Sequence, residues 1–151
     1  MSKRHKTLRM RILLALGTGL RLGDIDFENN SVTTRSKKTR KSIGSRPVPV
    51  PIMAELKKYV SGLDAEQEKI FNDNFSRYTW KKVRRKLGLD DLKFHDLRKT
   101  FGSVLAQNGV STAVTQKLLE HSSPDLTNKV YTNVDPVLRH AVDQIPAGDW
   151  L

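Results

Sequence analysis

The stretch from Phe94 to Thr132 limits the possible folds of this chain more than any other segment. Apolar residues recur there at helical spacing until Asn108-Gly109, a pair that can stop a helix, so the pattern predicts a helix over 95–107. A second apolar repeat follows Ser111, and Ser123-Pro124-Asp125 has the cap, the proline and the acid of another helix start. Three helices in one run predict a mainly helical fold.

The same spacing predicts further helices elsewhere in the chain. They are expected over 8–16, 52–60 and 76–87, and each is followed by glycine, which favours a helix end. In the first of them the predicted apolar stripe consists of Leu8, Ile12, Ala15 and Leu16, with Gly17 and Gly19 as the stop. A last amphipathic repeat over 137–145 predicts a C-terminal helix.

One segment has the pattern of strands instead. Val32-Thr33-Thr34 and the residues 46–50 are strand candidates, and Ile43-Gly44-Ser45 between them is the expected turn. A small antiparallel sheet is therefore predicted, with a turn that presents Lys and Arg. The fold class expected from these patterns is mainly α with a small antiparallel β-sheet (α+β), in one domain over residues 1–151.

The charge of the chain points to a polyanionic partner. Twenty-seven Lys and Arg against sixteen Asp and Glu give a net charge of +11, and nucleic acid is the commonest partner of such a surface. A basic surface that only keeps the protein soluble is the alternative. Clustering favours the partner, because six basic residues lie between Arg77 and Lys86 and six between Arg35 and Arg46.

Composition also excludes several kinds of site. The chain has no cysteine, which excludes disulfides, thiolate zinc sites and cysteine nucleophiles. No apolar run reaches the length of a membrane span, so we expect no membrane partner and a soluble, cytosolic chain.

His95 and Arg98 are the first candidates for chemistry. At i and i+3 they project from one side of the predicted helix. Cleavage of a phosphodiester without a metal needs cations on the phosphate oxygens, a nucleophile and an acid for the leaving alkoxide. Guanidinium suits the first task because its planar fork donates to two phosphate oxygens, and histidine suits proton transfer. The alternative is a helix-capping histidine beside a surface arginine.

Other motifs join this pair in a fixed order. Thr18-Gly19-Leu20-Arg21 precedes it, and Leu119-Glu120-His121 and then Tyr131 follow it. The order Arg, His-x-x-Arg, His, Tyr resembles the catalytic signature of the tyrosine recombinases, the phage-integrase family of DNA strand-transfer enzymes, over residues of about 10 to about 135. Glu120 replaces the usual Gly of the family. The segment after Arg21 is short, either by a deletion or because residues are missing from the chain.

The resemblance implies a role for each of these residues. Tyr131 would attack a DNA phosphate, giving a 3′-phosphotyrosine and a free 5′-hydroxyl. Arg21, Arg98 and His121 would hold the phosphate. Lys38 and His95 would manage protons, although Lys37 also fits the position of the family's hairpin lysine. No metal and no other cofactor is implied.

Other basic residues are expected to hold DNA rather than to react. This predicted DNA-binding set consists of Lys37, Arg40, Lys41, Arg46, Arg77, Lys81, Lys82 and Arg85. The implied partners are double-stranded DNA and further protomers in a tetramer on DNA.

The resemblance leaves the activity and the tail open to alternatives. The chain is interpreted as a catalytic domain without the family's N-terminal DNA-clamping module. The alternatives are an inactive DNA-binding remnant of the same fold and a DNA-relaxing type IB topoisomerase. The segment 137–151 is expected to dock on a neighbouring protomer, or else to fold back on its own domain.

Overall fold

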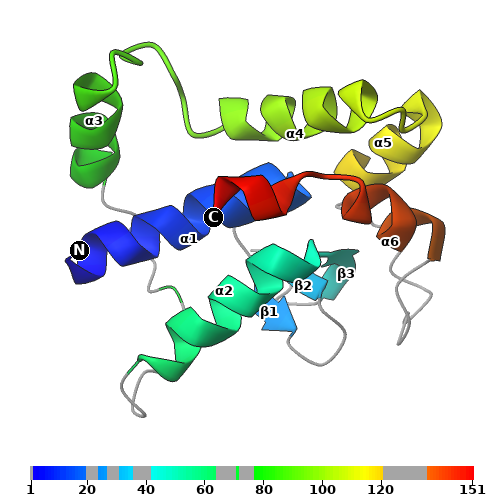
Figure 1. Ribbon diagram of the computed structural model, residues 1–151, viewed down its shortest axis with the longest axis horizontal. Helices are drawn as coiled ribbons and strands as arrows, with labels where there is room; N and C mark the ends of the chain where they lie inside the picture. The colour runs from blue at the N-terminus through cyan, green and yellow to red at the C-terminus, as the bar shows by residue number, and fades with distance from the viewer. Residues whose placement is uncertain are drawn as a thin grey trace.

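The structure of the chain is a computed structural model (Figure 1). The described residues are 2–19, 24–26, 31–35, 42–63, 71, 77–120 and 136–151, and for 24–26, 31–35, 42–45 and 120 only the backbone is described. They are mainly helical, as predicted. The helices are α1 (Lys3–Thr18), α2 (Val50–Ser61), α3 (Arg77–Lys86), α4 (Asp96–Gln107), α5 (Thr112–Glu120), α6 (Pro136–Asp143) and the 3-10 helix η2 (Ala147–Trp150). The helix predicted from Ser123 lies outside the described residues.

Helix α1 is the centre of the molecule. Figure 1 shows it between α4 and α2, and it also contacts α3. The predicted stripe of Leu8 and Ala15, with Ile12 and Leu16 half-buried, packs in a small cluster with Trp80 and Leu97. The opposite side of α1, which the stripe did not predict, belongs to the main core.

That main core joins most of the elements in one cluster. A helix that is apolar on two sides must be covered on both, which is why α1 lies inside the molecule. The buried residues of this core are Met10, Leu13, Leu14, Val48, Ile52, Met53, Leu56, Phe101, Leu105, Leu118, Leu138, Ala141, Val142, Ile145 and Ala147.

The two glycines at the end of α1 have different roles. Gly19 is the cap, with a φ of 66° and its N–H bonded to the Ala15 carbonyl, so the stop predicted there is confirmed. Gly17 is inside the helix, and the prediction that it stops the helix is wrong. A Cβ at Gly17 would lie 2.5 Å from Ile52 Cδ1, so glycine lets α1 and α2 approach closely.

Three strands pair antiparallel in the order β1-β2-β3. They are β1 (Asp24–Asp26), β2 (Ser31–Arg35) and β3 (Ser42–Pro47). The turn expected at Ile43-Gly44-Ser45 is wrong, because these residues lie within β3. The strand expected to reach Val50 ends at Pro47, since Pro49 and Pro51 favour a helix start and Val50 already belongs to α2.

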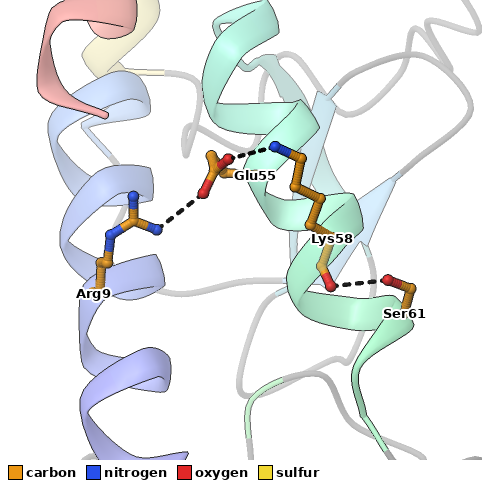
Figure 2. Close-up of polar contacts among 4 residues, drawn as sticks. All are labelled: Arg9, Glu55, Lys58 and Ser61. Carbon is orange, nitrogen blue, oxygen red and sulfur yellow. Dashed lines mark hydrogen bonds and ion pairs between the residues drawn. The ribbon is translucent and has the colours of Figure 1, made fainter. Parts of the chain in front are cut away.

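Polar contacts join α1 to α2 near the middle of both helices. Figure 2 shows Arg9 of α1 and Lys58 of α2 at the two carboxylate oxygens of Glu55, at 3.1 and 3.0 Å. Both bonds hold the pKa of Glu55 below its usual value, the bond from Lys58 more than that from Arg9. The Thr7 and Tyr59 hydroxyls form a further bond of 2.8 Å.

The C-terminal segment packs on its own chain. Leu138, Val142 and Ile145 are buried in the main core, and Arg139 donates to the Val48 carbonyl at 2.8 Å. Of the two alternatives for the predicted stripe, the structure shows burial within the domain. Val137 and Leu151 remain exposed, at 58% and 46%. Docking on a neighbouring protomer stays a prediction that now concerns exposed residues. In the described ranges, no helix is both long and apolar enough to cross a membrane.

Candidate active site

His95 lies at the start of α4, on the segment that leads in from α3. It caps the helix with its backbone, its side chain makes no capping bond, and it is exposed. The preceding Phe94 packs edge-on against Trp80 of α3, with ring centroids 5.5 Å apart. Such an aromatic pair contributes about 0.5–1.5 kcal/mol beyond the area it buries. The contact with α3 therefore holds the residue that directly precedes His95 in place.

Asp96 also stabilises the segment that contains His95. One of its carboxylate oxygens accepts the Lys93 backbone N–H at 2.8 Å, and the other pairs with Lys99 at 3.2 Å. These bonds, the backbone one first, keep the pKa of Asp96 below its usual value. Residues 93–96 are thus closed into a turn, and His95 lies within it.

Arg98 is half-buried where two other helices end. Its Nη1 donates to the Gly19 carbonyl at 2.9 Å, and its Nη2 donates to the Leu119 carbonyl. Gly19 caps α1, and Leu119 is in the last turn of α5. Carbonyls at a helix C-terminus lack helical partners and carry partial negative charge, so a cation is favourable there. Arg98 thereby ties α4 to the ends of α1 and α5.

These two ends lead directly into other predicted catalytic residues. Gly19 stands two positions before Arg21, and Leu119 stands two positions before His121. The side chains of Arg21 and His121 lie outside the described residues. What the structure brings together is Arg98 and the two segments from which these residues follow.

Gly19 allows this close approach. A Cβ at this position would lie 2.6 Å from Phe101 Cδ1 and 3.0 Å from Leu119 Cδ2, and its φ is in the left-handed region. A side chain would therefore push α4 and α5 away from the end of α1. The geometry around Arg98 depends on a residue without a side chain.

Arg46 of β3 reaches the same place from the sheet. It is 1% exposed, and its Nη2 donates to the Leu119 carbonyl at 3.4 Å, so Arg46 and Arg98 share one acceptor. Burial, and secondarily the charge of Arg98, lowers the pKa of Arg46 to about 10. Arg46 was predicted as a DNA contact, but its burial separates it from the exposed members of that set.

The basic face of α3 is the exposed part of the predicted DNA-binding set. Arg77, Lys81, Lys82 and Arg85 are all exposed, while Thr79 and Trp80 on the other side of the helix are buried. Arg85 forms an ion pair with Asp90 at 3.6 Å, in which both side chains are exposed. Screened by water, such a pair leaves the arginine available to a phosphate.

Several predicted residues have no described structure. The predicted catalytic residues Arg21, Lys38, His121 and Tyr131, and the predicted DNA contacts Lys37, Arg40 and Lys41, lie outside the described residues. Their roles stay predictions. In the part of the chain that is described, no three His, Asp or Glu side chains are grouped as a metal site would require.

The structure also places residues that the sequence pattern did not single out. Asp96 falls inside the His-x-x-Arg motif, where three-residue spacing to Lys93 and Lys99 was the available signal for its contacts. The Arg46 contact with Leu119 crosses 73 positions of sequence, and no local pattern predicts it.

Comparison with known sequences identifies the family. The sequence profile described as "Phage integrase family" matches residues 2–137, which includes every described element up to the start of α6. The chain belongs to the phage integrase family.

The relatives of this phage integrase family chain are named integrases or tyrosine recombinases. It is 29% identical over 148 residues to a probable integrase/recombinase of Acholeplasma phage L2, covering 85% of this chain and 50% of the relative. It is 29% identical to the tyrosine recombinase XerA of Pyrococcus furiosus (90% and 54% covered) and 31% identical to that of Saccharolobus solfataricus (83% and 45%). The chain thus spans about half the length of the curated relatives it matches.

Proposed function

We propose that this chain is the catalytic domain of a site-specific DNA recombinase, a mainly helical domain with a small antiparallel sheet. The Tyr131 hydroxyl attacks a DNA phosphate, the bond to the 5′ oxygen breaks, and a 3′-phosphotyrosine and a free 5′-hydroxyl form. A hydroxyl of a second strand then attacks the phosphotyrosine and releases Tyr131. The integrase and recombinase names of its relatives support this reaction class.

The position of Arg98 is the observation that carries the proposal. A half-buried guanidinium fixed by two backbone carbonyls cannot swing freely, so its fork is preorganised. The carbonyls that fix it belong to the segments leading into Arg21 and His121. A surface arginine beside a capping histidine, the alternative for this motif, would not be tied to two other helix ends.

The remaining roles follow from side-chain chemistry. Arg21, Arg98 and His121 hold the non-bridging oxygens, and His95 and Lys38 transfer protons. The side chain of His95 is exposed at the start of α4, so a substrate can reach it. The phosphodiester is held and cleaved by these side chains, so the proposal requires neither a metal nor a nucleotide. Duplex DNA is the substrate, and the cytoplasm or nucleoid is where the protein would meet it.

The test is covalent trapping on a nicked duplex. A nick just beyond the scissile phosphate lets the short product diffuse away, so an active enzyme accumulates as a protein–DNA adduct. We expect an adduct with the parent chain, none with Tyr131→Phe, and an unchanged yield with Tyr78→Phe, since Tyr78 is 73% exposed on α3 and outside the motif. DNA binding without any adduct in the parent chain would favour the inactive remnant instead.

Assembly of protomers on DNA is part of the same proposal. Val137 is 58% exposed on α6, whereas Val142 in the same helix is fully buried, so the proposed contact with a neighbouring protomer is placed at Val137. Val137→Ser should lower complex formation on a two-site DNA in a gel-shift assay and leave the melting temperature unchanged. If this variant assembles fully, Val137 does not contribute to the contact between protomers.

A further inference from the structure

Arg46 is a buried cation with unused hydrogen-bond donors. It is the largest of the fully buried side chains described, at 1% exposure. Its Nη2 has the long bond to the Leu119 carbonyl, but its Nε and Nη1 have no hydrogen-bond partner in the described part of the chain. None of the ion pairs between described residues includes it.

A guanidinium in such a place is unfavourable for the folded protein alone. A buried charge is normally paired, and unpaired buried donors lose their bonds to water. Arg46 has instead a second guanidinium beside it, because Arg98 donates to the same carbonyl oxygen. Two like charges at one acceptor repel each other, and in a desolvated place this repulsion is weakly screened.

Burial and repulsion both act on the pKa of Arg46, which they lower to about 10. Arg46 therefore stays charged at neutral pH. An apolar side chain of similar length would fill the same space without these costs. The arrangement becomes favourable once an anion lies against Arg98, because the negative charge of the anion offsets the repulsion between the two guanidinium groups.

We propose that Arg46 is a positioning residue for the candidate active site. It donates to the Leu119 carbonyl that orients Arg98, and its buried charge beside Arg98 strengthens binding of a phosphodiester. This proposal rests on the proposed function. It adds a sheet residue, expected from sequence only as an outer DNA contact, to the phosphate-holding centre.

A purely structural role for Arg46 is the rival, and two substrates distinguish the roles. One nicked duplex carries an ordinary scissile phosphodiester, and the other carries a methylphosphonate there, which is neutral. Single-turnover cleavage is measured at saturating protein with the parent chain, Arg46→Met and Arg46→Lys. Methionine keeps most of the side-chain length without charge, and lysine keeps the charge without the fork.

If Arg46 acts on the anion, the effect of removing it must depend on the charge of the substrate. We expect Arg46→Met to slow cleavage of the phosphodiester by about 10²-fold, the scale of one preorganised charge contact. The same variant should slow the methylphosphonate reaction far less, and Arg46→Lys should recover much of the phosphodiester rate. Equal slowing on both substrates would overturn the proposal and leave Arg46 a structural residue.

A DNA-free measurement separates this proposal from the proposed function. Inorganic phosphate should raise the melting temperature of the parent chain and of Arg46→Lys more than that of Arg46→Met. If the parent chain leaves no adduct on DNA but shows this difference, the recombinase function fails while the anion site stands. Equal shifts in all three proteins would overturn the anion site. If Arg46→Met does not fold, the comparison is made between the parent chain and Arg46→Gln.

Discussion

Arg98 and the basic face of α3 both carry positively charged side chains, but the two regions differ in burial. Arg98 is half-buried and bonded to backbone carbonyls 79 and 21 positions away in sequence. Arg77, Lys81, Lys82 and Arg85 on α3 are exposed, and Arg85 forms its ion pair with Asp90, only a few positions further along the chain. The position of Arg98 depends on contacts between helices that are distant in sequence, whereas the cations of α3 lie on the surface of a single helix.

This difference indicates how a basic chain can separate holding DNA from cleaving it. Exposed cations bind any phosphate, and their contribution falls with salt. A cation fixed by the ends of other helices can act at one phosphate only, and it depends on the packing around it. Mutations should therefore affect stability and chemistry in the first region, and affinity in the second.

The largest effect is expected at the packing that supports Arg98. Gly19→Ala would place a Cβ 2.6 Å from Phe101 and force a left-handed φ on alanine. We expect the free energy of unfolding to fall by about 3 kcal/mol or more, from strain and overpacking together. Denaturant unfolding measures this change.

Gly88→Ala is the matched control for that variant. Gly88 has nearly the same φ, 69°, but nothing within 4 Å of its added Cβ. The free energy of unfolding of Gly88→Ala should fall only by the backbone strain of the left-handed φ, about 1–2 kcal/mol. Equal losses in the two variants would mean that crowding at Gly19 does not matter, and the comparison between the regions would break.

The exposed region should respond through affinity and not through stability. Replacing Lys81, Lys82 and Arg85 with Gln together should weaken binding to any duplex and reduce the slope of log K against log salt by about 0.9 for each phosphate that is no longer neutralised. Each replacement should change the free energy of unfolding by no more than about 0.5 kcal/mol. Lys6→Gln with Lys57→Gln, exposed on α1 and α2, is the control. The control removes two charges and the α3 variant removes three, so an equal change of slope for each charge removed would show that net charge matters and not the α3 face.

The smallest effect is expected at the Glu55 ion pairs, which are partly covered. The pKa of Glu55 is lowered in the folded state by Lys58 and Arg9, so its contribution to stability is present above its unfolded pKa and is lost as pH falls through the folded pKa. The melting temperature of the parent chain should therefore fall further in acid than that of Glu55→Gln. Parallel pH curves for the two proteins would show that these pairs stabilise nothing.

Helices were the part of the fold best predicted from sequence, because apolar spacing and glycine stops are local signals. The ends of α3 and α4 lie within two residues of the prediction, and α5 begins at Thr112, directly after the predicted cap Ser111. The turn at Ile43-Gly44-Ser45 was wrong because glycine there is accommodated in β3. The second apolar side of α1 was missed, since only the three-dimensional packing reveals that both sides are covered.

For the candidate site, the sequence predicts which residues take part but not how they contact one another. The motif order named His95 and Arg98, and chemistry gave each a role. The shared Leu119 carbonyl and the burial of Arg46 depend on segments that are distant in sequence, so charge pattern alone grouped Arg46 with surface cations. Lys38 and Tyr131, outside the described residues, rest on the sequence argument.

Cleavage by Arg98→Lys at saturating protein tests the central claim most directly. Lysine keeps the charge but cannot donate to the Gly19 and Leu119 carbonyls and a phosphate in one fixed plane. We predict that single-turnover adduct formation falls by about 10²-fold or more, with duplex affinity nearly unchanged, while the α3 triple variant shows the reverse. Equal losses of affinity and cleavage in Arg98→Lys would make Arg98 one more phosphate contact and would contradict the division between the two regions.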